Sequence, residues 1–291
     1  FELGRTLLGY ELQTILAGAD SLAASGGGRP LGIIGWGEGG LHALYAAAIA
    51  PGIDACCLSG FFGPRESLWK EPAEHALFGL LVAFGDAEIA ALISPRPLVI
   101  EFGDSPEAAF RTAGGELEIL EVRPTKNGKP GRFEQHPAAA VRREGARLRE
   151  LVGDAVAIGL FETAAAIGTE TLVAFLEQLT GGKRDAIPTP PLWQLTAGEE
   201  DLEAAVMARR QRFATVIERH TQQSLVESPG DRARFFADLQ TENLAAFEES
   251  IADYREHFRT EVIGDFLRMR CFVKFFFMKS DRESFKFFAT L

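Results

Sequence analysis

The chain has 291 residues, 46% of them hydrophobic, and a formal net charge of −11. A chain of this length can bury about 75% of its unfolded surface, so it can form a substantial core. The acidic balance argues against a nucleic-acid groove, and no apolar run reaches the roughly 18 residues of a membrane-spanning helix. The cysteines predict no metal or disulfide site, because Cys56 and Cys57 are neighbours that point to opposite faces of a strand and Cys271 is far away.

Helices and strands are predicted to alternate over residues 1–182. The first helix covers about residues 1–24 and ends at the stretch SGGGRP. Further helices are predicted at 41–50, 72–92, 138–152 and 169–179, and short buried strands at 31–35, 53–58, 97–102 and 155–161. These strands are nearly unbroken apolar runs, which predict a parallel sheet covered by helices on both faces. A charged excursion follows the third strand and holds one more short strand at 117–122.

The pattern changes after residue 182. Residues 183–198 form a Pro-rich linker, and residues 199–265 are charged and helical, with helices at 199–226 and 231–264. The second of these has one apolar face, so we expect a helical hairpin that docks on another surface. The tail, residues 266–291, is basic and rich in Phe. Three interpretations of it stay open: the first strand of a further domain, an amphipathic membrane-surface anchor, or a foreign sequence such as a translated frame change.

A glycine-rich turn, LGIIGWGEGG, spans residues 31–40. Gly35, Gly37 and Gly40 fit the GxGxxG spacing of a dinucleotide-binding turn. That interpretation also needs an acidic residue at the end of the next strand, to bind the ribose. Asp54 has about the right separation, but it lies at the start of its strand. Nucleotide binding through this turn is therefore kept only as an alternative.

The same turn fits G-x-S-x-G, the nucleophile elbow of α/β-hydrolases, over residues 35–39. The outer glycines are expected because strand and helix pass too close for a Cβ. The middle position, where the nucleophilic serine belongs, is occupied by Gly37. Glycine has no side chain, so it can neither attack a carbonyl nor form an acyl-enzyme.

Two blocks extend this likeness along the chain. They are GWGEGGLHALYAAAIAPGIDACCLSGFFGPRESLWKEP, from Gly35, and FGDAEIAALISPRPLVIEFGD, up to Asp104. Residues 1–182 resemble the dienelactone-hydrolase and acetyl-xylan-esterase-like branch of the α/β-hydrolases, and are similar to large bacterial members. The later YREHFRTEVIG resembles a segment that leads to a second hydrolase-like domain. The resemblance implies an α/β fold: a partial α/β-hydrolase-type parallel sheet, with strands from the elbow onward, and a C-terminal helical appendage.

The resemblance also implies a triad of serine, acid and histidine. The nucleophile position is Gly37, and the acid position is Asp104, with Glu101 as the second choice. The histidine is expected near residues 161–167, which contain none. His136 lies before the preceding helix and is a substitute only if its loop folds back. Two of the three positions are therefore empty.

A substitute set of residues is the alternative. Glu38, Glu101 and Asp104 could form an acidic cluster at the strand ends, suited to a cation or to acid–base chemistry, and Ser59 could line the same crevice. The amide of Glu38 is one oxyanion donor, but its carboxylate opposes a developing negative charge. The plainer interpretation makes Glu38 a solvated carboxylate and Ser59 a serine bonded to backbone. We expect a packing role for His42 and exposed positions for His220 and His257.

Three functions follow from these observations. The first is a protein of carboxylic-ester hydrolase ancestry without serine-hydrolase activity, with a structural or ligand-binding role. The second is an active esterase, of carbohydrate-ester or lactone type, that uses the substitute residues. The third is nucleotide binding. No cofactor, metal or nucleic acid is expected, and the ligand would be a small ester-like or carbohydrate molecule.

The strand at 31–35 is expected to have an unpaired edge. In the family fold, the strands on its other side come earlier in the sequence and would precede Phe1. An uncharged, apolar edge invites pairing or aggregation. We therefore expect residues 199–265, a partner or a second hydrolase-like domain to cover it.

Overall fold

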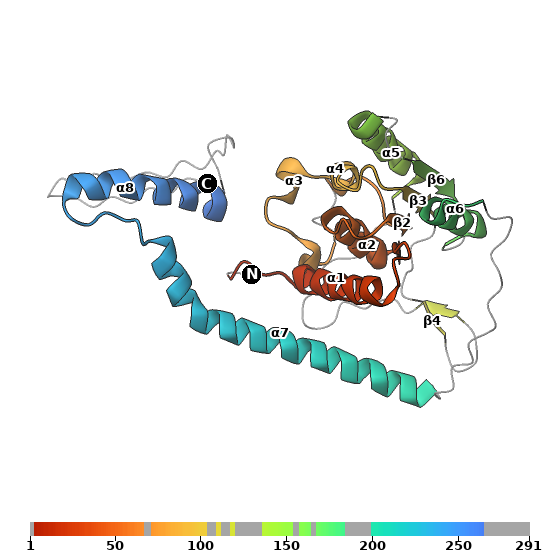
Figure 1. The fold of residues 1–291 in the computed structure, drawn as a ribbon, viewed down its shortest axis with the longest axis horizontal. Helices are drawn as coiled ribbons and strands as arrows, with labels where there is room; N and C mark the ends of the chain where they lie inside the picture. The colour runs from red at the N-terminus through yellow and green to blue at the C-terminus, as the bar shows by residue number, and fades with distance from the viewer. Residues whose placement is uncertain are drawn as a thin grey trace, which may run out of the picture. The chain divides into compact units, whose positions relative to one another are not determined.

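The computed structural model describes residues 3–66, 71–103, 109–111, 117–119, 136–153, 157–163, 167–183 and 199–264. The chain divides into two units, residues 1–217 and 218–291, which are described separately. The first unit has α/β architecture, as predicted, with helices around a sheet (Figure 1). The sheet has four strands in the order β1-β2-β3-β6. Its strands are β1 (Gly32–Trp36), β2 (Ala55–Ser59), β3 (Leu98–Phe102) and β6 (Ile158–Glu162).

All neighbouring strands of this sheet are parallel. Cys57 of β2 lies between Ile34 of β1 and Val99 of β3, and Val99 lies beside Gly159 of β6. Every residue of β2 and β3 is buried, as their continuous apolar sequences predict. The strands that follow β1 in the sequence thus lie on one side of it.

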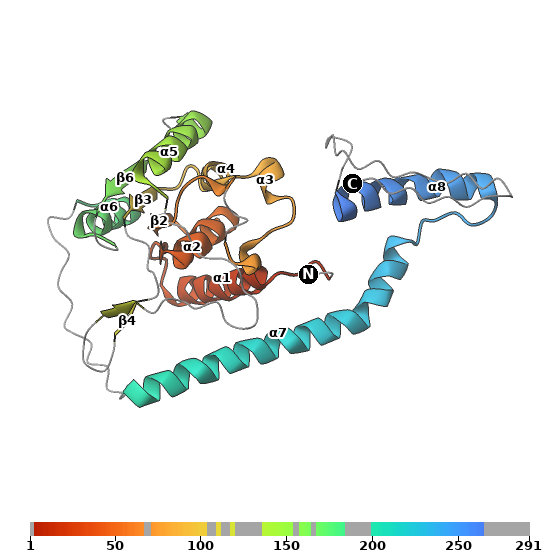
Figure 2. The ribbon, with the colours of Figure 1, turned by 180° about the vertical axis from the view of Figure 1, so that it is seen from behind.

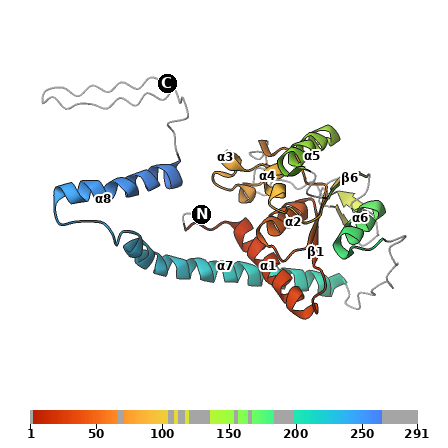
Figure 3. The ribbon, with the colours of Figure 1, turned by 45° about the horizontal axis from the view of Figure 1, so that its top comes forward.

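Helices cover both faces of the sheet. One face carries α1 (Leu7–Ser25), α2 (Glu38–Ile49), α4 (Asp86–Ala91) and α5 (Ala138–Val152), and the other carries α6 (Thr169–Thr180). Figure 3 shows α2 and α6 on opposite sides of the strands, and Figure 2 shows α5 and α6 beside β6 from behind. Cys56 packs in the first core and Cys57 in the second, so the two thiols point apart as predicted.

The guanidinium of Arg96 holds the end of α2. Its Nη1 donates to the carbonyl oxygens of Ala50 and Ile53, at 2.9 and 2.6 Å, and its Nη2 donates to that of Ala47 at 2.7 Å. The last carbonyls of a helix lack intrahelical partners, and a cation near them is favourable. Arg96 therefore fixes the helix that begins directly after Gly37.

The region 72–92 is less helical than predicted. It forms a 3₁₀ turn η2 (Ala73–His75), a one-turn helix α3 (Leu80–Ala83), and α4. Gly79, with φ of 73°, precedes α3, and Gly85 precedes α4 in an extended conformation. These two glycines divide the segment. The first helix also starts later than expected, because Thr6 caps it by accepting the Gly9 amide at 3.0 Å.

A small hairpin follows β3. It is formed by β4 (Ala109–Arg111) and β5 (Leu117–Ile119), which pair antiparallel. The second strand matches the short strand predicted at 117–122. The predicted linker beyond Lys183 and the predicted tail at 266–291 lie outside the described residues.

Helix α7 (Glu199–Phe235) continues through the break predicted between residues 226 and 231. The predicted break is wrong, because the helix tolerates Pro229 in its interior. Proline cannot donate to the carbonyl of Leu225, four residues earlier, but the Ser228 hydroxyl donates to it at 3.1 Å. No helix among the described residues has the length and hydropathy to cross a membrane.

The second unit contains the end of α7, then α8 (Leu244–His257) and a π-helical turn at Phe258–Ile263. Aromatic side chains join the two helices. The Phe235 ring centroid lies 5.2 Å from those of Phe236, Tyr254 and His257. The rings of Phe236 and Tyr254 stack at 4.7 Å. These ring contacts connect the end of α7 to α8, although Phe235 and Phe236 stay 47% and 43% exposed.

Candidate active site

Gly37 forms the turn between β1 and α2, at the carboxyl edge of the sheet. Its φ of 57° and ψ of −123° lie outside the regions that L-residues occupy freely. Its amide donates to the carbonyl of Ser59 at 2.9 Å, and its carbonyl accepts the amide of Gly40 at 2.8 Å. A sharp, strained turn from strand to helix is the geometry in which an elbow presents its nucleophile. Gly37 contributes no side-chain atom to this turn.

The close approach of strand and helix explains some of the surrounding glycines. A Cβ on Gly35 would lie 1.9 Å from the carbonyl oxygen of Gly39, and a Cβ on Gly40 would lie 2.6 Å from the Cβ of Phe61. Gly35 and Gly40 are therefore required. The same expectation for Gly39 is wrong, because a Cβ there would meet nothing within 4 Å.

Ser59 and Glu101, two predicted site residues, come together at the ends of β2 and β3. The Ser59 hydroxyl donates to Oε1 of Glu101 at 2.6 Å. The same carboxylate accepts the amides of Ile167 and Gly168, each at 2.7 Å. Glu101 is 1% exposed and lies at the start of α6, where the helix dipole favours negative charge. Both side chains are thus engaged in holding the end of this helix.

Ile167 adopts a φ of 52°, which is unusual for a β-branched residue. Its amide is held by Glu101, and it also lies 3.4 Å from the hydroxyl oxygen of Ser59. Ile167 belongs to residues 161–167, where the resemblance places the triad histidine. The strained backbone there orients an amide toward a buried carboxylate.

Glu38 does not join Glu101 and Ser59. Its Oε1 lies 2.8 Å from Nε2 of His75, and its side chain is 56% exposed. The ring of His75 is buried, and its Nδ1 lies 3.5 Å from Oε2 of Glu71. Burial lowers the pKa of His75. Hydrogen bonds to Glu38 and Glu71 and the charges of both carboxylates outweigh that effect and raise the pKa to about 9. The acidic cluster expected from Glu38, Glu101 and Asp104 is thus divided, and Asp104 itself lies outside the described residues.

A buried series of charges continues from His75. Arg65 binds Glu71 through two contacts, at 3.1 and 3.3 Å, and its Nε lies 3.5 Å from Oδ1 of Asp86. The other oxygen of Asp86 accepts the amide of Gly63 at 3.1 Å. Burial raises the pKa of Asp86 to about 7, although the Arg65 charge and the Gly63 amide lower it. The sequence analysis found none of these residues, although the i, i+4 spacing of Glu71 and His75 is a visible signal.

His136 lies against the segment that follows β2. A Cβ on Gly63 would lie 2.2 Å from Cδ2 of His136, so the ring packs directly on this glycine. His42, by contrast, connects two helices. Its Nδ1 lies 2.9 Å from the carbonyl oxygen of Glu38, and its Nε2 lies 2.9 Å from Oε2 of Glu11 in α1.

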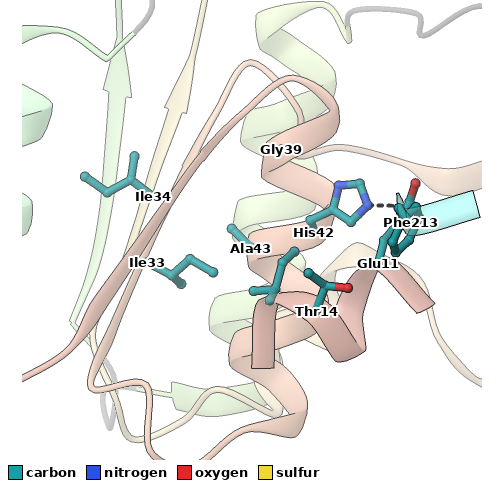
Figure 4. A pocket seen from close by; sticks show the side chains of 9 residues that line it. Glu11, Thr14, Ile33, Ile34, Gly39, His42, Ala43 and Phe213 are labelled. Atoms are coloured by element: carbon teal, nitrogen blue, oxygen red, sulfur yellow. Dashed lines mark hydrogen bonds and ion pairs between the residues drawn. The ribbon is translucent and has the colours of Figure 1, made fainter. Parts of the chain in front are cut away.

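A pocket of about 450 Å³ lies beside β1 (Figure 4). Ile33 and Ile34 of β1, residues of α1 and α2, and Phe213 of α7 line it. Figure 4 shows Glu11 and His42 facing one another at its polar side. Asp54 lies at the opposite, amino end of the sheet, where its carboxylate accepts the amide of Leu31 at 2.7 Å.

The described residues bring together no group of three His, Cys, Asp or Glu side chains that could hold a metal ion. Cys56 and Cys57 are free and buried. Burial raises the pKa of both thiols, most strongly for Cys56, which keeps them in the unreactive protonated form.

No protein-family model and no curated protein sequence matches this chain. Among solved structures, it is similar to a carbohydrate esterase family 15 glucuronoyl esterase from Caldicellulosiruptor kristjansonii, with 16% sequence identity and a TM-score of 0.31. The similarity covers 52% of this chain and 43% of the esterase. The chain thus matches less than half of that enzyme.

Proposed function

We propose that this chain is an α/β-hydrolase-like protein of carboxylic-ester hydrolase ancestry that has no serine-hydrolase activity and serves a structural or ligand-binding role. Gly37 is the observation that carries the proposal. It occupies the turn between β1 and α2 with a φ of 57°, where a nucleophile would project from the sheet edge. Without a hydroxyl or thiol at this point, no covalent acyl intermediate can form there.

The nearby polar groups support the same proposal. The Ser59 hydroxyl is committed to Glu101, whose charge is also stabilised by two backbone amides. The Ser59 hydroxyl therefore belongs to a set of contacts that holds the start of α6. His75 lies between two carboxylates, and with a pKa of about 9 it is protonated at neutral pH. A protonated imidazole cannot accept a proton from a nucleophile.

Introducing a serine tests this proposal directly. The Gly37→Ser variant is expected to leave p-nitrophenyl acetate hydrolysis at the level of buffer, because residues 161–167, where the resemblance places the triad histidine, contain none. An L-residue at this backbone conformation costs about 1–3 kcal/mol, so the variant should also melt at a lower temperature. Activity assays and thermal unfolding check both expectations.

Gly39→Ser is the matched control, because a Cβ there meets nothing within 4 Å. It should melt close to the wild type and remain inactive. Wild-type labelling by a fluorophosphonate would contradict the proposal, as would esterase activity that is lost in Ser59→Ala or Glu38→Ala. Activity lost in either of these two variants would favour an active esterase that uses the substitute set of residues.

We also propose that further polypeptide covers the outer edge of β1. Among the described strands, β1 pairs only with β2. Alternate residues of a parallel strand bond to opposite sides, and Gly37 donates toward β2. The amide and carbonyl of Ile34 therefore point away from the sheet. Residues 32–36 contain no charge or proline to protect this edge, and Phe213 lines the pocket beside it.

An exposed edge of this kind should make the isolated chain associate. Sedimentation velocity is expected to show species that grow with protein concentration, and Ile34→Lys should reduce them. Val82→Lys, at an exposed site outside the sheet, is the control and should not. If residues of the chain cover the edge instead, the Ile34 amide should be protected from hydrogen exchange in a monomer. A monodisperse monomer whose Ile34 amide exchanges freely would overturn the proposal.

A further inference from the structure

The side chain of His75 connects two parts of the first unit. One is the first turn of α2, which carries Glu38 directly after the elbow glycine. The other is the segment from Arg65 to Asp86, which holds the buried charges. The Nε2 atom of His75 lies 2.8 Å from the Glu38 carboxylate, and its Nδ1 lies 3.5 Å from that of Glu71. The ring is 1% exposed, so water does not replace these contacts.

This geometry favours a protonated ring. A neutral imidazole has one N–H donor and one acceptor nitrogen, whereas an imidazolium donates from both nitrogens. Both nitrogens of His75 face carboxylate oxygens, which accept only. Loss of the proton therefore removes one donor and turns a bridging contact into a repulsive one.

Above about pH 7, where Asp86 is ionised, the surrounding buried charges are balanced only with that proton. His75 and Arg65 are the buried cations of this cluster, and Glu71 and Asp86 are its buried carboxylates. Without the proton the buried set is left with one excess negative charge, which is costly in a poorly hydrated site.

Other titratable groups surround these residues on the neighbouring elements. Tyr45 of α2 is close enough to Arg65 and Asp86 for their charges to influence its ionisation, and α1 also packs against residues 73–75. The first turns of α1 carry Tyr10 and Glu11, and Glu11 is paired with His42. Glu74 adjoins His75 in η2, and Glu144 of α5 acts on Asp86. Of the groups around it, Glu38 and Glu71 are those whose hydrogen bonds and charges act on His75.

We propose that His75 is a proton-dependent latch, whose imidazolium ties the elbow end of α2 to residues 71–86 and releases Glu38 when the proton is lost. This inference does not depend on whether the protein binds a ligand or retains catalysis. The latch fixes the backbone on either side of Gly37, because Glu38 is the first residue of α2. Its release loosens the first turn of that helix.

The direction of the pH dependence follows from the two states of the ring. The pKa is about 9 in the folded protein and 6.5 for an ordinary histidine, so the folded form binds the proton more tightly. The stabilising contribution is complete below pH 6.5 and is lost as the pH rises through about 9. The latch is therefore closed at neutral pH and opens in alkaline solution.

Trp36, which precedes the elbow and is 38% exposed, is a reporter for this event. The experiment uses the full 291-residue chain with Trp69→Phe and Trp193→Phe, so that Trp36 is the remaining tryptophan. Its emission should shift to longer wavelength as the pH passes about 9. His75→Gln should abolish this transition. Glu38→Gln should move its midpoint to lower pH by at least about one unit, because one of the two carboxylates that favour the charged ring is lost.

His42→Gln is the control, since it removes another histidine of the same helix and should leave the midpoint unchanged. If His75→Gln does not fold, the ring resonances of His75 in the wild type give the same information by NMR titration. The latch is wrong if that ring titrates near its ordinary pKa. It is also wrong if the Trp36 transition persists in His75→Gln, or keeps its midpoint in Glu38→Gln.

Discussion

Glu101→Ala is expected to lower the free energy of unfolding of the first unit by about 3–4 kcal/mol, from the loss of three hydrogen bonds to a buried carboxylate. The substitution leaves the amides of Ile167 and Gly168 and the hydroxyl of Ser59 without this acceptor. It also removes a negative charge from the start of α6. Urea unfolding followed by tryptophan fluorescence measures the change, with an unchanged m-value as the sign of two-state behaviour.

Two controls separate this role from a general effect of removing acids. Glu162→Ala removes an exposed carboxylate from the same edge of the sheet and should change stability by less than about 1 kcal/mol. Glu101→Gln keeps one acceptor but directs N–H groups toward the helix amides, so it should be intermediate or as damaging as alanine. A Glu101→Ala variant as stable as the wild type would refute the structural role assigned to this residue.

Arg65→Met should have an effect of similar or greater size. The guanidinium is 1% exposed and neutralises Glu71 and Asp86, which are buried as well. Removing one partner of a buried ion pair costs about 3–5 kcal/mol, because the other charge stays without compensation. Chemical unfolding at neutral pH measures this loss.

The pH dependence of that loss distinguishes a charge effect from a packing effect. Asp86 already binds its proton near neutrality, with a pKa of about 7, and removal of Arg65 raises that pKa further. A protonated carboxyl needs no cation, so Arg65→Met should cost less at pH 5 than at pH 8. Arg142→Met, at an exposed ion pair, is the control and should cost less than about 1 kcal/mol at both. A large loss that does not change with pH would assign the role of Arg65 to packing.

The layered fold could be predicted because the apolar pattern of each segment depends on local burial. The run IDACCL reads as a strand buried on both faces, and Cys56 and Cys57 do lie in separate cores. The helices within residues 72–92 were harder to predict from the sequence. There Gly79 and Gly85 start new short helices, and a helical period alone does not show where such breaks fall.

The candidate site was only partly predictable. Glu101 interrupts an otherwise apolar strand, and a charge in such a run signals a buried carboxylate with partners, which the structure provides. Its companion Ile167 has no such signal, because its role depends on backbone conformation. His75 is 37 residues from Glu38 in the sequence. A contact over that separation depends on how the elements pack, so the latch residues were visible only in the folded chain.

The stacked rings at the junction of α7 and α8 give the two units separate spectroscopic signatures. Every tryptophan of the chain lies before residue 218, whereas Tyr254 is the one tyrosine after it. Tyr254 stacks on Phe236, so its near-ultraviolet circular dichroism reports the integrity of the helical appendage. Indole emission reports the sheet-containing unit instead. Recording both during one thermal ramp would resolve whether the halves of the molecule melt as one cooperative block or in sequence.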